Sequence, residues 1–280
     1  MQRQGRTGGG RSIYPSAALT RSEDMTDNDA VSARPTPPPA EPPVTLTVDI
    51  GGTGIKMVRL DAVGAPLGDR ARELTPRPAR PPALLAVVAK MLKAQAPFDR
   101  VSVGFPGVVV RGVVHTAPNL DEAAWRGTDL GREIATLTQR PVRTLNDADL
   151  QGYGVIDGEG VELVLTLGTG LGSALFTGGH LVANLELAHH PFGAGGESYE
   201  TRISDAACRA VGPEVFTERV VGMIEQLAPI LNCDRFFLGG GNARHVARSR
   251  VPTTVRFFDN VDGMRGGVAL WRDQAPLLAM

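Results

Sequence analysis

The alternation of apolar and polar residues in the first half of the chain predicts short strands joined by glycine-rich turns. Residues 44–50 (VTLTVDI) are rich in β-branched side chains and predict a strand. A glycine turn at 51–54 follows, and residues 55–61 return as a second strand. A third strand is expected after the turn at 63–65, ending near the proline cluster at 75–82.

Helical spacing appears next, at residues 81–95. Their apolar side chains recur at i, i+3, i+4 and i+7, which is typical of a helix with one buried face. The remaining elements of this half are a buried strand ending in a turn (100–107), a hairpin (108–115), a helix (128–140) and a strand with polar residues at its carboxyl end (141–147). The first half therefore combines strands with helices.

The second half of the chain repeats this order. Residues 161–182 predict a strand, a glycine turn, a second strand and another turn. The elements expected after it are helices around 199–211 and 213–231, a strand running into glycines (235–241), a strand (253–259) and a helix (263–273). Two halves that each begin with a strand–turn–strand unit and then add helices predict an α/β protein of two domains. Ligands are expected at the carboxyl ends of the strands, between the halves.

The predicted domain boundaries follow from the same segments. Residues 1–43 include GRTGGGRS and six prolines between positions 33 and 43, which predicts a disordered tail that takes no part in the fold. Met25 is an alternative start of the chain on this contrast in composition. The domains expected after the tail are an N-terminal α/β domain (44–147), a C-terminal α/β domain (148–262) and a helix (263–280) that returns to the N-terminal domain.

Charge and composition exclude several classes of protein. The 29 Lys and Arg residues nearly balance the 30 Asp and Glu residues, whereas a dedicated nucleic-acid binder usually has a basic excess. No apolar run approaches the roughly 18 residues of a membrane span, so neither nucleic acid nor membrane is expected as a partner. The two cysteines cannot form a disulfide framework, which indicates a reducing, cytoplasmic compartment.

Three glycine turns carry the candidate chemistry. Each directly follows an apolar strand, at residues 49–54, 168–172 and 239–241. Glycines let backbone N–H groups turn inward around an anion, although each turn taken alone is most simply a hairpin turn. None has the spacing of a Walker loop or of a dinucleotide-binding loop. Together they favour a cradle for phosphates, beside which Asp49 could hold Mg²⁺ or its water ligand.

Segments spread over the whole ordered chain match one family in order. They are DIGGTGIK (49–56), FPGVV (105–109), PNLDEAAW (118–125), LNDAD (145–149), LTLGTGLGSALF (165–176), LELAHHPF (185–192) and LGGGNA (238–243). On these motifs the chain resembles the ROK sugar kinases, and among them the polyphosphate glucokinases and glucomannokinases. The resemblance covers about residues 44–273. It implies the α/β, two-domain fold of the actin-like ATPases, which is ribonuclease H-like, with a cleft between the halves.

The resemblance implies a catalytic role for one carboxylate. In LNDAD, Asp147 takes the position of the base that accepts the proton of the sugar 6-hydroxyl. A carboxylate at a strand end can also align the attacking oxygen. The alternative for Asp147 is a helix N-cap, since it opens the DADL segment. Asp149 is interpreted as a solvated or capping residue.

Further polar residues match the sugar-ring ligands of the family, namely Asn119, Asn146, Glu186 and His189. Amide, carboxylate and imidazole groups suit a polyol because they form hydrogen bonds in fixed directions. Taken alone, Asn119 is a turn residue and His189 a partly buried histidine. Asp121 and Trp125, which lie in the same segment as Asn119, are expected to close and pack the loop.

The glycine turns match the positions that bind the phosphoryl donor. The residues at the donor phosphates are Gly51, Gly52, Thr53, Gly168, Thr169 and Gly170, and those near an adenosine are Gly239, Gly240 and Gly241. Polyphosphate and ATP both stay open as donors, because such cradles bind a phosphate chain with or without a nucleoside. Mg²⁺ is expected as the cofactor, reached by Asp49 through water. Lys56 either contacts phosphate or points outward from its strand.

Two departures from the family pattern concern the sugar and metal sites. Ala188 stands where the family has glycine, and it would be strained if that position required a positive φ. The cysteines that bind structural zinc in many members are missing, because only Cys208 follows His189 closely. A tetrahedral site needs three or four ligands, so no zinc is expected, and the adjacent His189 and His190 are not a metal pair.

The sequence thus predicts a sugar kinase that transfers a phosphoryl group from polyphosphate or ATP to the 6-hydroxyl of glucose or mannose. A homodimer is expected. The alternatives are a sugar-responsive ROK regulator and a non-catalytic sugar-binding relative. The segment before residue 44 is too short and proline-rich for a winged helix, which, together with Asp147, disfavours the regulator. Ala188 is the feature that favours the non-catalytic relative.

Overall fold

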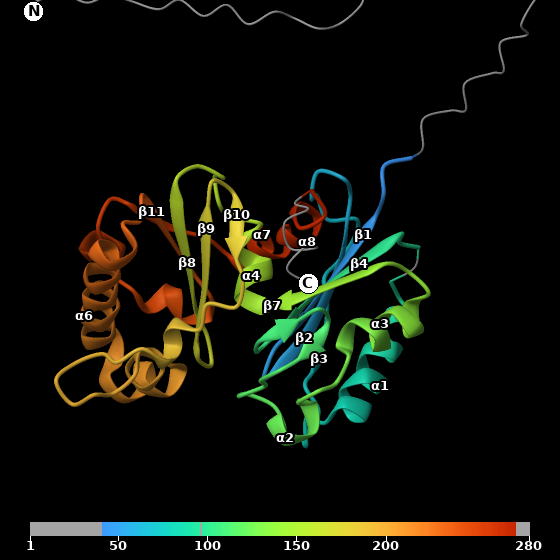
Figure 1. Cartoon of the computed structure of the whole chain (residues 1–280), viewed down its shortest axis with the longest axis horizontal. Coiled ribbons are helices and arrows are strands. Elements are labelled where there is room, and N and C mark those ends of the chain that lie inside the picture. Colours follow the sequence, from blue (N-terminus) through green and yellow to red (C-terminus); the bar gives the residue numbers. More distant parts are fainter. Residues whose placement is uncertain (1–40, 96, 273–280) are drawn as a thin grey trace, which may run out of the picture. The chain divides into compact units, whose positions relative to one another are not determined.

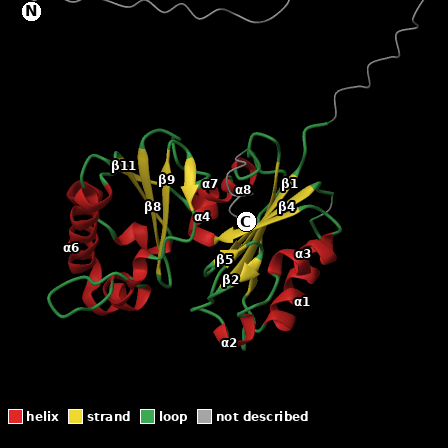
Figure 2. Ribbon diagram, viewed as in Figure 1, coloured by secondary structure: helices red, strands yellow, loops and turns green. Residues whose placement is uncertain are grey.

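The computed structural model describes residues 41–95 and 97–272. The predicted tail over 1–43 lies almost wholly outside these residues, and its last three members, residues 41–43, are exposed and form no helix or strand. The described chain contains two five-stranded sheets and one two-stranded hairpin, with helices beside them (Figure 1, Figure 2). This mixed α/β architecture is the one predicted from the spacing of apolar residues.

The first sheet has the strand order β3-β2-β1-β4-β7. Its strands are β1 (Thr45–Ile50), β2 (Gly54–Leu60), β3 (Ala71–Leu74), β4 (Arg100–Phe105) and β7 (Val142–Asn146). The first three pair antiparallel, whereas β4 and β7 continue the sheet parallel to β1. All residues of β1 are buried, as expected for a central strand. The predicted hairpin at 108–115 consists of β5 (Val109–Val110) and β6 (Val113–Val114).

The second sheet repeats this topology. Its strands are β8 (Val161–Leu167), β9 (Leu171–Thr177), β10 (His180–Val182), β11 (Arg235–Gly239) and β12 (Val255–Phe257), in the order β10-β9-β8-β11-β12. β8, β9 and β10 pair antiparallel, and β11 and β12 continue the sheet parallel to β8. Each half therefore begins with a hairpin and adds parallel strands, which confirms the predicted repetition.

Helices α1 (Pro81–Leu92) and α3 (Leu130–Thr138) pack on the first sheet (Figure 1). α1 begins with prolines, whose missing N–H groups cost no hydrogen bond at this position. Leu84 and Val88 belong to the apolar stripe that the spacing predicted, and they share one core with Ile134 of α3. α1 ends at Leu92 instead of the predicted residue 95.

The loop that carries Asn119 is closed by α2 (Glu122–Trp125). Asp121 caps this helix, and its carboxylate pairs with Arg80 at 2.8 Å. Trp125 is fully buried, and its ring lies 4.9 Å from that of Phe105 between centroids. Its indole N–H donates to a backbone carbonyl oxygen at 2.7 Å. Asp121 and Trp125 therefore have the structural roles that the sequence predicted.

In the second half, α5 (Tyr199–Ile203) and α6 (Asp205–Leu231) pack on the second sheet, and α6 is seen beside it in Figure 1. Gly212 interrupts α6 with a left-handed φ of 76°, and Pro213 follows it. Proline fits the first turn of a helix that restarts there. The break thus lies where the sequence predicted two separate helices.

A short helix, α4 (Asp147–Gly152), follows β7 directly; the sequence offered a helix here only through the N-cap alternative for Asp147. Leu150 is buried in a core shared with Phe176 of β9. A Cβ on Gly152 would collide with the Phe176 ring, and a Cβ on Gly104 of β4 would lie 3.3 Å from Asp147 Cα. α4 therefore packs closely against strands of both sheets.

The last described segment forms two short helices, α7 (Asn260–Met264) and α8 (Gly266–Ala269), instead of the single helix predicted over 263–273. Three glycines, at positions 263, 266 and 267, lower the helix propensity here. They also allow close packing, since a Cβ on Gly267 would collide with Thr47 of β1. Ser102 of β4 donates a hydrogen bond to Gly267 O at 2.6 Å. Residues 273–280 lie outside the described part, and the predicted domain boundaries stay predictions.

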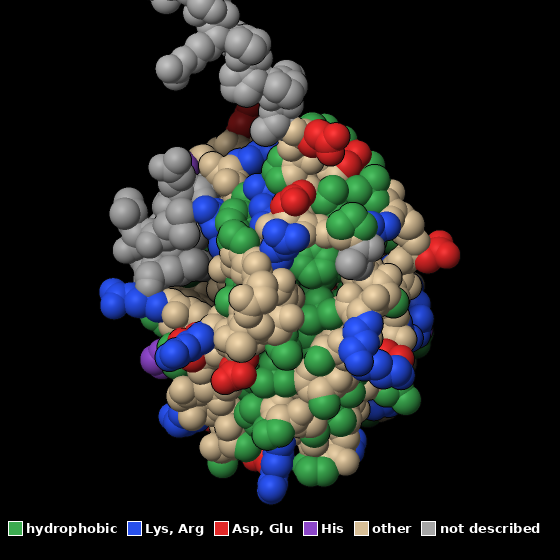
Figure 3. Space-filling view, turned by 90° about the vertical axis from the view of Figure 1, so that its right-hand side faces the viewer, with side chains coloured by type: hydrophobic (Ala, Val, Ile, Leu, Met, Phe, Trp, Pro, Cys, Tyr) green, Lys and Arg blue, Asp and Glu red, His purple; other side chains and the backbone are tan. Residues whose placement is uncertain are grey.

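Short 3₁₀ helices and the surface complete the description. The 3₁₀ helices are η1 (Leu187–His189), η2 (Gly241–His245) and η3 (Arg248–Arg250). Among the described helices, none is long and apolar enough to cross a membrane. On the face shown in Figure 3, basic and acidic side chains are interspersed. The described residues on this face therefore lack the continuous basic stripe that is typical of nucleic-acid binding.

Candidate active site

Each of the three predicted glycine turns follows the carboxyl end of a strand. The first (51–53) joins β1 to β2, the second (168–170) joins β8 to β9, and the third (239–241) ends β11. Main-chain hydrogen bonds close the first turn, between residues 51 and 54 at 3.0 Å, and the second, between residues 168 and 170 at 2.9 Å. Thr53 is exposed in the first turn. Gly240 has a left-handed φ of 84°, and a Cβ there would lie 2.5 Å from Leu167 O, so only glycine fits.

The second and third turns contact each other. Asn242 Nδ2 donates to Gly168 O at 3.0 Å, and Gly240 packs against Leu167, the residue before the second turn. Asp205 N, at the start of α6, donates to Thr169 O at 3.4 Å. The structure therefore brings together the matched donor positions Gly168, Thr169, Gly170, Gly239, Gly240 and Gly241.

The first turn lies beside the segment that carries Asn119. A Cβ on Gly52 would lie 3.1 Å from Asn119 Cβ. Thr75 Oγ1 donates to Gly51 O at 2.6 Å, and the Arg77 guanidinium donates to Gly52 O at 2.8 Å. Because neighbouring side chains satisfy its carbonyl groups, this turn is held in one conformation next to a candidate sugar ligand.

Asp147 is the first residue of α4, and its side chain is half-buried. Asn146 caps the helix, because its Oδ1 accepts hydrogen bonds from the N–H groups of Ala148 (2.8 Å) and Asp149 (3.3 Å). Asn146 Nδ2 donates to Gly107 O at 3.2 Å. The N-cap alternative for Asp147 is therefore wrong, although its carboxylate also accepts a hydrogen bond from Ala148 N, at 2.8 Å, in the first turn of the helix.

Three charged side chains, those of Asp49, Lys56 and Glu186, act on the pKa of Asp147. The pKa of Asp147 is raised to about 7, first by burial and then by the nearby carboxylate of Asp49, with a smaller contribution from Glu186. The N–H of Ala148 and the ammonium of Lys56 oppose this shift of the pKa. A carboxylate with a pKa near 7 is matched to proton transfer at neutral pH.

Lys56 points into this site, which decides between the two alternatives for its orientation. Its Nζ lies 2.7 Å from Asp49 Oδ2, and its side chain is only 24 % exposed. Asp49 and Lys56 are direct partners in the antiparallel pairing of β1 with β2. The outward-facing interpretation is therefore wrong. The pairing that a short turn imposes on the two strands is the signal that could have placed Lys56 beside Asp49.

Glu186 and His189 lie on the segment that enters and forms η1. Glu186 immediately precedes η1 and is half-buried, whereas His189 is exposed at its end. The pKa of Glu186 is raised, mainly by burial, while His189 lowers it and Glu200 raises it. Ala188 is buried inside η1 without a left-handed φ. The backbone strain that a positive φ would have caused at Ala188 is therefore absent.

Glu200 is a residue of the site that the sequence did not single out. Its Oε2 accepts a hydrogen bond from Leu171 N at 2.7 Å, directly after the second glycine turn. A Cβ on Gly170 would collide with the Glu200 carboxylate. Glu200 also acts on the pKa of Glu186. One carboxylate thus links the candidate donor turn to the candidate sugar segment.

Asp149 is not the solvated or capping residue that the sequence predicted. It is fully buried, and its Oδ2 accepts a hydrogen bond from Asn184 N at 3.1 Å. Its pKa is raised to about 8, mainly by burial; the Asn184 N–H lowers it, and Glu186 and Asp147 raise it. The expectation failed because burial of α4 depends on the second sheet, which lies later in the chain.

Asp49 is the candidate ligand for Mg²⁺ in this site, and its Oδ2 is paired with the Lys56 ammonium at 2.7 Å. Mg²⁺ is usually held by one or two carboxylates together with waters and substrate phosphates. Asp49 is such a carboxylate, at the end of the strand that enters the first glycine turn. Within residues 41–95 and 97–272, no three His, Cys, Asp or Glu side chains converge on a possible metal site. The expected absence of zinc stays a prediction.

His190 and the cysteines have packing roles in the described chain. The ring of His190 stacks on Tyr199 at 5.5 Å between centroids, and its Nδ1 lies 2.9 Å from Pro191 O. Cys208 is buried, and Cys208 and Cys233 are both free thiols. Burial raises the pKa of both thiols, so neither is activated as a nucleophile.

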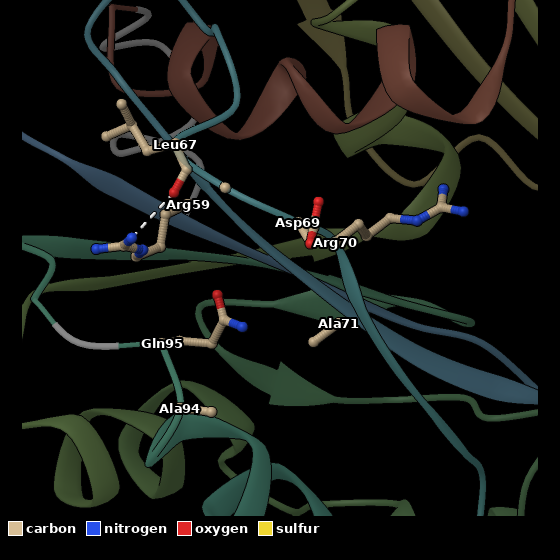
Figure 4. A pocket seen from close by; sticks show the side chains of 8 residues that line it. Arg59, Leu67, Asp69, Arg70, Ala71, Ala94 and Gln95 are labelled. Carbon is tan, nitrogen blue, oxygen red and sulfur yellow. Dashed lines mark hydrogen bonds between the residues drawn. The ribbon is translucent and has the colours of Figure 1, made fainter.

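The described part of the chain has a surface pocket of about 330 Å³ (Figure 4). Arg59, Leu67, Asp69 and Gln95 are among the residues that line it, and Arg59 Nη2 donates to Leu67 O at 2.9 Å. None of the candidate catalytic, sugar or phosphate residues lines this pocket. The pocket is therefore not part of the candidate active site.

Comparison with known proteins identifies similar sequences over most of the chain. The model of the ROK family matches residues 45–190. The chain is 32 % identical over 274 residues to the polyphosphate glucokinase of Mycobacterium leprae (strain TN), which covers 89 % of this chain and 83 % of that protein. It is 34 % identical over 237 residues to the polyphosphate glucokinase of Mycobacterium tuberculosis (strain ATCC 25177 / H37Ra), covering 78 % and 88 %.

A solved structure is similar to most of this chain. The inorganic polyphosphate/ATP-glucomannokinase from Arthrobacter sp. strain KM superposes with a TM-score of 0.74 at 32 % identity, covering 82 % of this chain and all of that chain. The family match spans β1 to η1, which includes Asp49, Asn119, Asp147 and Glu186. The chain therefore belongs to the ROK family and has the actin-like ATPase fold of its sugar kinases, as the motifs predicted.

Proposed function

We propose that this chain is a kinase that transfers a phosphoryl group from polyphosphate or ATP to the 6-hydroxyl of glucose or mannose. The observation that carries the proposal is the position of Asp147, a carboxylate with a pKa of about 7, among Asp49, Lys56 and Glu186. The similarity to polyphosphate glucokinases and to a polyphosphate/ATP-glucomannokinase supports the substrate classes.

In the proposed reaction, Asp147 is the general base. The sugar 6-oxygen attacks the terminal phosphorus of the donor, its proton passes to an Asp147 carboxylate oxygen, and the bond from phosphorus to the leaving oxygen breaks. The raised pKa makes Asp147 a better proton acceptor than an ordinary aspartate, while leaving a useful fraction ionised at neutral pH. A positioned base of this kind typically contributes about 10²- to 10⁴-fold to the rate.

The phosphates are proposed to lie on the glycine turns, with Lys56 as the neighbouring cation. Backbone N–H groups of such turns form concave anion sites. The Lys56 ammonium, held by Asp49 at 2.7 Å, can balance charge that builds up on the transferring phosphoryl group. When bound at Asp49, Mg²⁺ would supply further positive charge to the phosphate oxygens.

The proposed sugar ligands come from segments before and after Asp147 in the sequence. Asn119 lies beside the first glycine turn, and Asn146 immediately precedes Asp147. Glu186 acts on the pKa of Asp147, and His189 acts on that of Glu186. The proposal also includes a cytoplasmic homodimer, and the free thiols of the described cysteines are compatible with a reducing compartment.

A steady-state assay tests this function. The full chain is incubated with glucose and Mg²⁺, with either ATP or polyphosphate, and glucose 6-phosphate is followed by a coupled dehydrogenase. Turnover with at least one donor, and its loss in EDTA, is the expected result. A folded protein that turns over neither glucose nor mannose with either donor contradicts the proposal.

The pH profile should report the raised pKa of Asp147. Because the base must be ionised, kcat/KM for glucose should fall about tenfold per pH unit below roughly pH 7, where Asp147 takes up a proton. Burial raises this pKa most, and Asp49, Glu186 and Lys56 are the charged neighbours that act on it. A profile that stays flat down to about pH 5.5 would exclude Asp147 as the titrating base.

Glu186→Gln should weaken the response of the protein to sugar. Millimolar glucose or mannose should raise the melting temperature of the wild type, because a ligand that binds only the folded state stabilises it. The variant should show a smaller rise but nearly the same melting temperature without sugar, since burial already disfavours the ionised form of Glu186. Glu214→Gln, at an exposed position of α6, is the matched control. Equal shifts in all three proteins would remove Glu186 from the sugar site.

A further inference from the structure

Asp149 is a buried carboxylate that the proposed chemistry does not use. It lies on α4 two residues after Asp147 and is fully buried. Helix formation does not require it, because Asn146 caps α4. Its Oδ1 has no hydrogen-bond partner, and its Oδ2 accepts from Asn184 N at 3.1 Å. A buried carboxyl group is costly to the fold, so its one hydrogen bond calls for a reason.

The partner of Asp149 is itself an unusual residue. Asn184 has a left-handed φ of 60°, a conformation that asparagine adopts more readily than most residues. Its side-chain amide pairs with both backbone groups of Val109 in β5. Val109 N donates to Asn184 Oδ1 at 3.2 Å, and Asn184 Nδ2 donates to Val109 O at 3.2 Å. The Asn184 side chain therefore forms the same pair of hydrogen bonds with Val109 that the backbone of a neighbouring strand would form.

Hydrogen bonds hold the chain on both sides of Glu186. On the side before Glu186, Asn184 is tied to α4 and to β5. On either side of Glu186, Ser173 of β9 donates to Leu185 O at 2.5 Å and accepts from Leu187 N at 3.2 Å. The Ser173 bonds fix the segment to its own sheet. The hydrogen bond from Asn184 N to Asp149 links it to the helix that begins with Asp147, and the Asn184 side chain links it to β5.

We propose that Asp149 and Asn184 are positioning residues, which hold the segment bearing Glu186 and His189 at a fixed distance from Asp147 and so align the sugar with the base. The role rests on the proposed sugar-kinase function. Neither side chain needs to touch the substrate. The raised pKa of Asp149, to about 8, is consistent with this role, because a neutral carboxyl group still accepts the Asn184 hydrogen bond.

The chain offers variants that separate position from fold. Asn184→Gly keeps the left-handed backbone without strain and removes both bonds to Val109. Asn232→Gly is the matched control, because Asn232 also has a left-handed φ, of 50°, and is exposed at the end of α6. Asp149→Asn keeps an acceptor for Asn184 N in the same shape, whereas Asp149→Ala removes it.

Kinetics with glucose and with the donor give the main test. Asn184→Gly and Asp149→Ala should lower kcat/KM for glucose about tenfold to a hundredfold, while KM for the donor changes by less than about threefold. Asp149→Asn and Asn232→Gly should stay within about threefold of the wild type in every constant. The double variant of Asn184→Gly and Asp149→Ala should lose less than the product of the single losses, because both act through one segment.

Two outcomes would overturn the positioning role. One is a folded Asn184→Gly protein with an unchanged kcat/KM for glucose. The other is a loss of activity in Asp149→Asn as large as that in Asp149→Ala, which would show that the negative charge, and not the hydrogen bond to Asn184, is what matters.

Hydrogen exchange keeps the test independent of activity and of the folding of Asp149→Ala. Amides of residues 184–190 should exchange faster in Asn184→Gly than in the wild type or in Asn232→Gly, while those of α1 are unchanged. Unchanged exchange over 184–190 contradicts the inference. A wild-type protein that phosphorylates no sugar would refute the proposed function, whereas this comparison would still decide whether Asn184 holds the segment.

Discussion

Asp147→Asn is expected to lower kcat by about 10²- to 10⁴-fold, with KM for the sugar close to that of the wild type. The amide has the shape of the carboxylate but cannot take the proton of the 6-hydroxyl. Asn146 caps α4, so the helix that positions residue 147 should be unaffected. Steady-state kinetics at saturating donor and Mg²⁺ measure the effect. A kcat within about threefold of the wild type would exclude Asp147 as the base.

The same substitution should change the stability of the protein, in a direction that depends on pH. The pKa of Asp147 is raised in the folded protein to about 7, from about 4 for an ordinary aspartate. Folding thus favours the protonated form, and this contribution to stability is lost as the pH rises from about 4 through 7. An uncharged Asn avoids that loss. The melting temperature of Asp147→Asn relative to the wild type should therefore be higher at pH 8 than at pH 5.

Asp149→Asn is the matched control for this experiment. It changes the other carboxylate of the same helix and keeps the acceptor for Asn184 N. We expect it to retain kcat within about threefold of the wild type. If Asp149→Asn lost as much turnover as Asp147→Asn, the assignment of the base to Asp147 alone would have to be given up.

Lys56→Met should lower kcat by about 10²- to 10³-fold, because it removes the cation that is proposed to balance charge on the transferring phosphoryl group. It should also move the acid limb of the pH profile upward. Lys56 lowers the pKa of Asp147, so its removal should raise that pKa above 7. The fall in kcat tests the role of Lys56 toward the phosphoryl group, and the shift of the limb tests its electrostatic contact with Asp147.

Lys90→Met is the control for the loss of a lysine. Lys90 also pairs with a carboxylate at 2.8 Å, that of Glu73, but its side chain is 72 % exposed. Exposed pairs contribute about 0–1 kcal/mol to the free energy of unfolding, so little change is expected. Lys56→Met leaves Asp49 buried without its partner, and should cost about 1–3 kcal/mol. Equal kinetics in the two variants would remove Lys56 from the mechanism.

Strands and their turns could be predicted because local sequence specifies them. The apolar runs of β1 and β8, each followed by a glycine turn, determined the repeated start of both sheets. α4 was missed because six residues of polar sequence make too short a helix to be stable alone. It forms through the packing of Leu150 against residues of β9. The break between α7 and α8 likewise depends on glycines that fit against β1 and α4.

The candidate site was predictable where a motif names the residue, and less so where tertiary contacts decide. The turn at 51–53 fixes the pairing of β1 with β2, so the contact between Lys56 and Asp49 could have been derived from the strands alone. The burial of Asp149 and its hydrogen bond could not, because α4 packs against β9 and Asn184 lies 35 positions later in the chain. The role of Glu200 could not be predicted for the same reason, because Glu200 lies on α5 and accepts its hydrogen bond from Leu171 of β9.

Identification of the product is the decisive test of phosphoryl transfer to the 6-hydroxyl of the sugar. The wild-type chain is incubated with glucose, Mg²⁺ and polyphosphate or ATP, and the sugar product is examined by ³¹P and ¹³C nuclear magnetic resonance. We expect a single phosphate ester on the 6-oxygen, formed by the wild type and almost absent with Asp147→Asn. Esterification at another hydroxyl, or release of inorganic phosphate without a sugar ester, would contradict it.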